Sequence, residues 1–248
     1  MKFKKFCIAN FYSFFANDNL DALKVKITLL AKKHQIKGSV ILAPEGINCS
    51  LSGNFSNIEE IVRQIKDLTS SKDWIMHLNY ADFNPFLKLK IRIKTEIVSI
   101  GFPELEVPRL KGTYVSPKKW RDFISQSDVI LIDVRNNYEF EMGHFDNAVN
   151  PGTENFRDFS SWLNSQAENL KNKKVAMYCT GGIRCEKATA YLRNYLNFDQ
   201  AYQLEGGILE YLRQFGESSR AWQGECFVFD DRISVDRALK AKQEAHLT

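Results

Sequence analysis

The sequence lacks the features that place a protein in a membrane or outside the cell. None of its apolar runs approaches the ~20 residues that a membrane-spanning helix requires. The first six residues include three lysines but no long apolar segment or cleavage site, so we expect no signal peptide. We therefore expect a cytoplasmic protein that works without a membrane partner.

Patterns that bind metals or form disulfides are also scarce. The 248 residues include five cysteines, an odd number without close pairing, which is typical of a reduced cytoplasm. No Cys-x-x-Cys occurs, and the four histidines are scattered along the chain. We expect no metal site, and the sequence contains no indication of the oligomeric state.

Charge is plentiful but unevenly distributed. Apolar residues make up 44% of the chain and charged residues 26%, as in a globular protein. Residues 1–119 include 19 lysines and arginines against 11 acidic residues, whereas the remainder includes 15 against 19. This asymmetry predicts a basic module beside a neutral-to-acidic one, and an anionic partner such as nucleic acid would bind the first.

The first hundred residues predict a small α+β domain. Helices are expected after a cap at Asp18 and at the capping box Ser56–Glu59. The order strand–helix–strand–strand–helix–strand–strand, with both helices on one face of an antiparallel sheet, is ferredoxin-like. The expected strands cover residues 5–12, 40–43, 47–52, 74–80 and 87–99.

The last of these strands is strongly basic on one side. Alternation places three apolar side chains on one face, and on the other face Lys88, Lys90, Arg92 and Lys94. Like charges roughly 7 Å apart repel each other, so a phosphate backbone would relieve them, and the four residues are candidate RNA contacts. The alternative is a solvated face whose lysines protect an edge strand from aggregation, and this stretch alone leaves both interpretations open.

The second half of the chain has a different organisation. Residues 101–119 contain three prolines and little periodicity, so we expect a linker there. From 120 to 217 strands alternate with helices, which predicts an α/β domain with a parallel sheet and helices on both faces. Residues 218–248 would form a C-terminal extension. In a parallel sheet of this kind the reactive site lies beyond the carboxyl ends of the strands.

The most informative stretch runs from Val175 to Ala188. A buried strand over 175–178 ends just before Cys179, and a helix is expected over 184–197. Two glycines in the intervening loop allow the backbone N–H groups to converge, and these groups and the helix N-terminus both favour an anion. Cys179 should therefore ionise more readily than a free cysteine, and we predict a catalytic nucleophile on a surface loop. The alternative is a buried structural cysteine.

The residues after Cys179 form the predicted active-site loop. Its members are Thr180, Gly181, Gly182, Ile183, Arg184 and Cys185. Arg184 could support the loop or bind a phosphate. Cys185 could resolve a persulfide on Cys179 by forming a disulfide, or it could simply face the core.

Four motifs in the second half occur in the order typical of one family. They are Ile132–Arg135 with Glu139, Gly143–Ala148, Cys179–Arg184 and Leu204–Gly207. Through these motifs, residues ~116–217 resemble a rhodanese domain. In that family, the cysteine that matches Cys179 carries a persulfide. We expect Asp133, Arg135 and His144 to tie strand ends and loops together rather than to take part in chemistry.

The flanking segments narrow this resemblance. Ala43–Asn48, Lys88–Ile97 and Trp222–Arg232 resemble the tRNA uridine hydroxylase family, in which an acylphosphatase-like domain precedes a rhodanese domain. The resemblance covers nearly the whole chain. It implies an oxidoreductase of tRNA modification that forms 5-hydroxyuridine at the wobble position, with molecular oxygen as co-substrate and the anticodon arm as partner. Longer members continue into a cysteine-rich tail, whereas here only Ile233–Thr248 follow.

Three classes of function stay open at this point. RNA hydroxylation follows from the resemblance, and sulfur transfer through a Cys179 persulfide is the alternative. Phosphate-ester hydrolysis is disfavoured, because phosphatases of this fold place an arginine six positions after the cysteine, whereas Arg184 is five positions after Cys179. No cofactor is identified, and the residues leave open the reductant, the sulfur donor and the group that activates oxygen.

Overall fold

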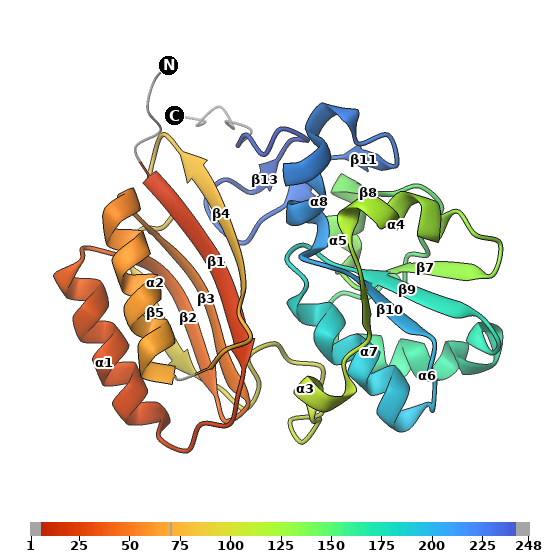
Figure 1. Ribbon diagram of the computed structural model, residues 1–248, viewed down its shortest axis with the longest axis horizontal. Coiled ribbons are helices and arrows are strands. Elements are labelled where there is room, and N and C mark those ends of the chain that lie inside the picture. The colour runs from red at the N-terminus through yellow and green to blue at the C-terminus, as the bar shows by residue number, and fades with distance from the viewer. Residues whose placement is uncertain (1–5, 70, 242–248) are drawn as a thin grey trace. The chain divides into compact units, whose positions relative to one another are not determined.

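The chain folds into two compact units (Figure 1). The structure is a computed structural model that describes residues 6–69 and 71–241. The first unit comprises residues 1–98 and the second residues 99–248, and each has its own sheet and its own apolar core. In the described part of the chain, no helix is both long enough and apolar enough to cross a bilayer.

The first unit is built on a five-stranded sheet of order β4-β1-β3-β2-β5. The neighbours among β1 to β4 pair antiparallel, whereas β5 runs parallel to β2. We expected an antiparallel sheet, but the sheet is mixed at its β5 edge. Residues 82–88 lead from β4, at one edge, to β5 at the other edge. The strands are β1 (Phe6–Phe14), β2 (Lys37–Ala43), β3 (Gly46–Gly53), β4 (Ile75–Ala81) and β5 (Leu89–Ile93).

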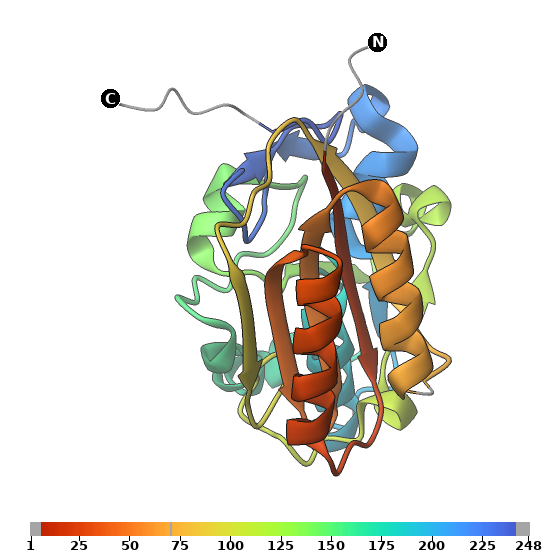
Figure 2. The same cartoon turned by 90° about the vertical axis from the view of Figure 1, so that its left-hand side faces the viewer.

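Two helices, α1 (Leu20–Lys33) and α2 (Phe55–Thr69), cover one face of this sheet (Figure 2). Their inward faces bury Leu23 and Ile27 on α1 and Ile61 on α2 within the core of the unit. Burial of these side chains removes apolar surface from water and holds the helices on the sheet. The ferredoxin-like prediction is confirmed.

The caps of the two helices differ from the prediction. Asn19, not Asp18, caps α1, since its Oδ1 accepts a hydrogen bond from the Ala22 N–H at 3.2 Å. Asn54 caps the start of α2, since its Oδ1 accepts a hydrogen bond from the Asn57 N–H at 2.9 Å. The predicted capping box Ser56–Glu59 lies inside this helix. Neighbouring residues offer the same kind of acceptor, and the local pattern therefore places a helix start only to within a residue or two.

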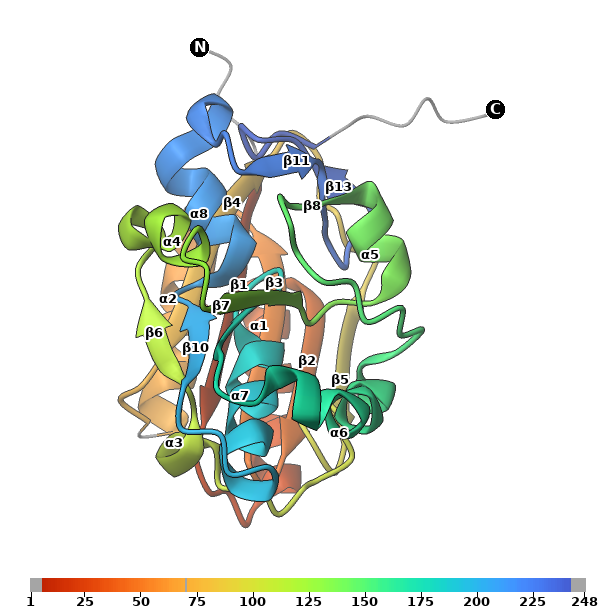
Figure 3. The ribbon, with the colours of Figure 1, turned by 90° about the vertical axis from the view of Figure 1, so that its right-hand side faces the viewer.

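The second unit contains a parallel sheet of order β6-β10-β9-β7. Helices α4 (Pro117–Ile124) and α8 (Gly207–Phe215) cover one face, and α6 (Phe159–Leu170) and α7 (Ile183–Tyr195) cover the other (Figures 1 and 3). The predicted parallel sheet with helices on both faces is confirmed. The strands are β6 (Thr113–Val115), β7 (Val129–Asp133), β9 (Lys174–Tyr178) and β10 (Ala201–Leu204).

Residues 101–119, expected to form a linker, contain regular structure. They include the short helix α3 (Val107–Leu110) and the edge strand β6, which pairs with β10. A strand of three residues is too short to show an alternating pattern, so periodicity could not reveal it.

The C-terminal segment contributes to the core of the second unit. β11 (Trp222–Gly224) pairs antiparallel with β8 (Gly143–Phe145), and β12 (Cys226–Phe227) pairs with β13 (Ser234–Val235). The Trp222 side chain is fully buried against Phe145, with ring centroids 5.1 Å apart. The remaining elements are α5 (Asn137–Met142), η1 (Phe156–Asp158) and η2 (Gly216–Ser218).

Candidate active site

Cys179 directly follows β9, a central strand of the parallel sheet. The chain then turns through the loop into α7, and Gly182 adopts a φ of +98°, a conformation that favours glycine. The Gly182 N–H donates to the Cys179 sulfur, with an N···Sγ distance of 3.2 Å. The predicted sequence of strand, cysteine, glycine loop and helix is therefore present in the structure.

A glycine at the start of α8 holds the loop from a second side. Gly207 has a φ of +65°, and a Cβ atom there would lie 2.5 Å from the carbonyl oxygen of Cys179. This close approach allows the N–H of Ile208 to donate to the Cys179 carbonyl at 3.0 Å, and the N–H of Leu209 to donate to the Thr180 carbonyl at 3.0 Å. The loop is thus fixed by backbone contacts that only a glycine permits.

The surroundings of Cys179 stabilise its thiolate form. Burial by itself would raise the pKa of this thiol. A hydrogen bond from the Cys185 thiol, the positive charge of Arg184 and the backbone N–H groups of the loop outweigh burial, and they lower the pKa of Cys179 from 9.0 to about 6. At neutral pH Cys179 is therefore mostly a thiolate, the nucleophilic form of cysteine.

Cys185 is the thiol that donates to this thiolate. Burial first, and then the hydrogen bond to Cys179 and the negative charge beside it, raise the pKa of Cys185 well above its ordinary value. The two fully buried cysteines therefore share one proton, which resides on Cys185. This arrangement fits both predicted alternatives, a resolving thiol and a core residue.

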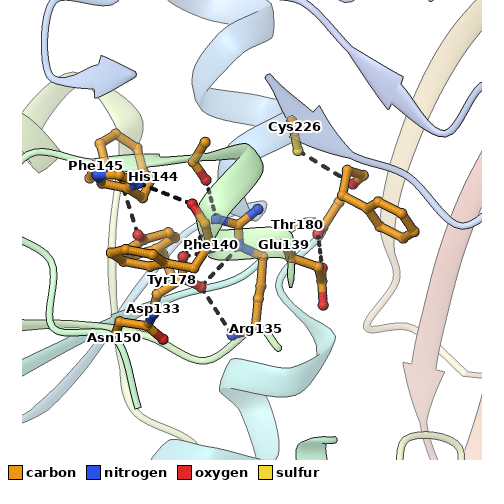
Figure 4. Close-up of polar contacts among 12 residues, drawn as sticks. Asp133, Arg135, Glu139, Phe140, His144, Phe145, Asn150, Tyr178, Thr180 and Cys226 are labelled. Carbon is orange, nitrogen blue, oxygen red and sulfur yellow. Dashed lines mark hydrogen bonds and ion pairs between the residues drawn. The ribbon is translucent and has the colours of Figure 1, made fainter. Parts of the chain in front are cut away.

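Arg184 is held by Glu139, which lies on α5. The guanidinium donates from Nη1 to Oε2 at 2.6 Å and from Nη2 to Oε1 at 2.8 Å, and both side chains are buried. The Thr180 hydroxyl lies 3.4 Å from the same carboxylate (Figure 4). Burial alone would raise the pKa of Glu139, but the charge of Arg184 lowers it overall, so the pair is ionic. The ion pair with Glu139 therefore fixes the Arg184 guanidinium beside the Cys179 loop.

A second buried ion pair joins the ends of two strands. Arg135 donates to Asp133 at 2.6 Å and to the carbonyl of Gly143 at 2.5 Å, and thus connects β7 to β8 (Figure 4). His144 stacks on Phe140, with its Nδ1 3.0 Å from that residue's carbonyl oxygen. These contacts join strand ends and loops, as expected for Asp133, Arg135 and His144; that the three residues take no part in chemistry stays a prediction.

The four predicted RNA contacts lie in the first unit, along β5. Lys88, Lys90, Arg92 and Lys94 are all exposed, while the intervening Leu89 and Ile91 pack against the core. None of the four forms an ion pair with another residue in the part of the chain that the structure describes. The edge strand therefore presents Lys90 and Arg92, and Lys88 and Lys94 flank it; we call these four residues the cations of β5.

Two features of the site were not foreseen. Cys179 was expected on a surface loop, but it has no exposed surface. Glu139 is 45 residues from its partner Arg184, so no local pattern could pair them. The sequence motif did include Gly206 and Gly207, and two glycines before a helix indicate a close approach of the backbone to another group.

Among residues 6–69 and 71–241, no three His, Cys, Asp or Glu side chains are grouped as metal ligands.

The fold and the site together define a class of protein. A parallel sheet whose central strand ends in a thiolate cysteine, cradled by a glycine loop and a helix N-terminus, is a rhodanese-like domain. Comparison with known families agrees: the rhodanese-like domain matches residues 116–214, and the UPF0176 acylphosphatase-like domain matches residues 6–97.

Curated relatives identify the family more closely. A tRNA uridine(34) hydroxylase of Rickettsia massiliae (strain Mtu5) is 45% identical over 232 residues, which is 94% of this chain and 94% of the relative. The protein of the same name from Rickettsia canadensis (strain McKiel) is 43% identical over 240 residues, 97% of this chain and 96% of the relative. The chain therefore belongs to the tRNA uridine(34) hydroxylase family.

Solved structures match the two units separately. A rhodanese-like domain from Anabaena sp. is 17% identical, with a TM-score of 0.36 over 45% of this chain and 78% of the other. An acylphosphatase from Coxiella burnetii is 12% identical, with a TM-score of 0.30 over 37% of this chain and 100% of the other.

Proposed function

We propose that this chain hydroxylates uridine 34 of tRNA, the wobble uridine, to 5-hydroxyuridine with molecular oxygen, and that Cys179 is the nucleophile. The observation that carries the proposal is the thiolate of Cys179, with a pKa of about 6, in a glycine loop. That thiolate occurs in a chain 45% identical over 94% of its length to a relative named tRNA uridine(34) hydroxylase.

The chemistry begins with the thiolate. Addition of the Cys179 sulfur to C6 of the uracil ring would form a C–S bond and leave an enolate whose C5 is rich in electrons. C5 then bonds to dioxygen, and protonation gives a hydroperoxide at C5. Reduction of the hydroperoxide to a hydroxyl, loss of the C5 proton and departure of the Cys179 thiolate restore the C5–C6 double bond.

The balance of this reaction requires a reductant. Uridine, dioxygen, two electrons and two protons give 5-hydroxyuridine and water. We assign the two electrons to a dithiol, which is oxidised to a disulfide as the hydroperoxide oxygen leaves as water. The Cys179 thiolate is regenerated in each cycle and is not consumed.

The tRNA would be held through its phosphates. The exposed cations of β5 offer contacts of the kind that position a nucleic acid without reading its sequence. Residues 1–119, with 19 basic and 11 acidic residues, would supply most of the electrostatic attraction.

The direct test measures tRNA nucleosides by mass spectrometry. A strain that lacks this gene would be complemented with wild type, Cys179→Ala or, as a matched control, Cys226→Ala, which removes another buried cysteine of the same unit. We expect 5-hydroxyuridine with wild type and Cys226→Ala, and none with Cys179→Ala or in cells grown without oxygen. Normal 5-hydroxyuridine in the Cys179→Ala strain would contradict the catalytic assignment.

Sulfur transfer is the second candidate, because the same convergent N–H groups that stabilise a thiolate would stabilise a persulfide on Cys179. The same measurement separates the two functions. Loss of 2-thiouridine in the Cys179→Ala strain, with 5-hydroxyuridine unchanged, would favour sulfur transfer.

A further inference from the structure

Two exposed aromatic side chains of the second unit are joined by a third, half-buried one. Tyr138 and Phe229 each contact Phe227 edge to face, and we call these three residues the aromatic cluster. The ring centroids of Tyr138 and Phe227 are 5.1 Å apart, and those of Phe227 and Phe229 are 5.0 Å apart. Phe229 is 61% exposed and Tyr138 is 41% exposed. Single exposed apolar residues are common, but two exposed rings joined through a third form an apolar patch of the kind that binds a partner.

The loop between β12 and β13 holds Phe229 in this position. The N–H of Val228 donates to the carbonyl of Ile233 at 2.8 Å, which closes the loop across its base. Within the loop, Arg232 donates to Asp230 at 2.7 Å and 2.6 Å, and both side chains are buried. Val228 is also buried, whereas its neighbour Phe229 is exposed.

The aromatic cluster adjoins the cysteine loop. The guanidinium of Arg184 lies 5.6 Å from the centre of the Phe229 ring, within the range of a cation–π contact. The same guanidinium is paired with Glu139, the residue that follows Tyr138 on α5. Both ends of the cluster are thus attached to the ion pair that supports the loop of Cys179.

We propose that the aromatic cluster is a stacking platform for a nucleobase of the anticodon loop, either uridine 34 or a base beside it. This inference rests on the proposed function. A thiolate attacks C6 from above or below the plane of the ring, so a face of the uracil must approach the Cys179 sulfur directly. Because Cys179 is buried, a base that stays in the stacked loop could not come that close. Uridine 34 must therefore leave the stack, and the unstacking costs free energy.

Aromatic side chains recover this cost. Single-stranded RNA bases are commonly held by stacking on Phe, Tyr and Trp, and each base–aromatic contact stabilises the complex without regard to sequence. The aromatic cluster offers exposed aromatic surface beside the loop that contains Cys179. It would hold splayed bases of the anticodon loop.

Binding to a synthetic anticodon stem–loop tests the platform. We expect Phe229→Ala and Phe229→Leu each to raise Kd about 5- to 150-fold, because leucine keeps the bulk of the side chain but lacks an aromatic face. Phe229→Trp should bind within about twofold of wild type, since it keeps the stacking surface. Phe55→Ala is the matched control, because Phe55 is an exposed phenylalanine on α2 in the other unit. The dependence of Kd on salt should be the same for all variants, since no phosphate contact is lost.

Photocrosslinking locates the base directly. Stem–loops with 5-iodouridine at position 34 or at either neighbour would be irradiated with wild-type protein, and the linked peptides identified by mass spectrometry. We expect a crosslink to Phe229, Phe227 or Tyr138 from at least one position. Stem–loops that bind but crosslink only to other residues would overturn the proposal, as would a Phe229→Leu variant that binds like wild type.

These outcomes are separate from those of the proposed function. If wild type forms no 5-hydroxyuridine but crosslinks at the aromatic cluster, the hydroxylase proposal fails and the platform stands. If wild type and Phe229→Leu form 5-hydroxyuridine with equal KM and bind the stem–loop equally, the platform fails and the hydroxylase proposal stands.

Discussion

Five cysteines share one chain, yet their surroundings give them opposite protonation states. Burial raises the pKa of Cys7 to about 11 and that of Cys226 to about 12, and it also raises the pKa of Cys49 and Cys185. Only Cys179 has a lowered pKa, because the Cys185 thiol, Arg184 and the loop N–H groups together outweigh its burial. The difference comes from the direction of nearby dipoles and charges, not from exposure, since all five are buried.

The first prediction concerns the titration of these thiols. When the pH of the native protein is increased to 9, the ultraviolet absorbance of thiolates should increase in a single step. The midpoint of this step should be at about pH 6, because that is the pKa of Cys179. This step should be absent in Cys179→Ser and present in Cys226→Ala. The unfolded chain keeps the thiol proton up to its ordinary pKa of 9.0, so ionisation of Cys179 stabilises the folded state increasingly from about pH 6 to 9. That contribution is lost as the pH falls through about 6, and a native titration midpoint near 9 would contradict this account.

The second prediction concerns Glu139. Replacement by Gln leaves the buried guanidinium of Arg184 without its counter-charge, and the free energy of unfolding should fall by about 3–5 kcal/mol. The uncompensated positive charge should also move the pKa of Cys179 below about 6, because it favours the thiolate more strongly. Glu141→Gln is the matched control, since Glu141 is an exposed carboxylate on the same helix.

Chemical denaturation and the thiolate titration measure the two effects of Glu139→Gln. An unchanged titration midpoint in a folded Glu139→Gln protein would show that Arg184 does not act on Cys179.

At the scale of elements, the site depends on the approach of one helix to a loop. The N-terminus of α8 meets the loop between β9 and α7, and two backbone hydrogen bonds join them. These bonds need a residue without a side chain at Gly207, where φ is +65°. Two backbone hydrogen bonds thus join elements that α7 and β10 separate in the sequence.

The third prediction tests this approach. Gly207→Ala places a Cβ 2.5 Å from the Cys179 carbonyl oxygen, so the loop or the helix must shift. Gly152→Ala is the matched control, because Gly152 has a φ of +67° but nothing within 4 Å of the added atom. Both variants incur backbone strain, but we expect only Gly207→Ala to lose the thiolate titration near pH 6.

Gly207→Ala should also lower the free energy of unfolding by roughly 1–3 kcal/mol more than the control variant does. Thermal or chemical denaturation measures this difference. Equal stability of the two variants, with the titration intact, would show that the close approach is unimportant.

At the scale of the whole molecule, the exposed cations of β5 and the residues around Cys179 lie in different units. The cations of β5 belong to the first unit, whereas the residues that hold Cys179 belong to the second. Binding of an anionic polymer and activation of the thiolate can therefore be altered independently.

The fourth prediction follows from this separation. Replacing Lys90 and Arg92 with Gln should weaken tRNA binding about equally for different tRNA sequences, because phosphate contacts do not read bases. Each lost contact should lower the slope of log Kd against log salt by roughly one. The thiolate titration of Cys179 should be unchanged. Lys26→Gln with Lys32→Gln on α1 removes the same charge from exposed helix positions and serves as the control.

Filter binding over a series of salt concentrations measures these slopes. If the β5 variant and wild type have the same slope, the basic face of β5 does not contact tRNA and is a solvated edge.

The sequence predicted most elements of both units, because periodicity and turn residues act over short distances. The alternation in Lys88–Lys94 placed the cations of β5 on one face correctly. The same local signals placed the caps of α1 and α2 one or two residues away from their true positions. They also missed β6, which has three residues and exists through its pairing with β10.

The sequence by itself determined the loop around Cys179, since the cysteine, the glycines and the following helix are contiguous and their dipoles converge wherever the segment lies. Only the tertiary structure decided that Cys179 is buried, that Arg184 pairs with Glu139, and that Gly207 approaches the loop. Glu139 is 45 positions from Arg184, and Gly207 is 28 positions from Cys179. Side chains so distant in the chain meet only when packing of the sheet and its helices brings them together, and no local pattern records that meeting.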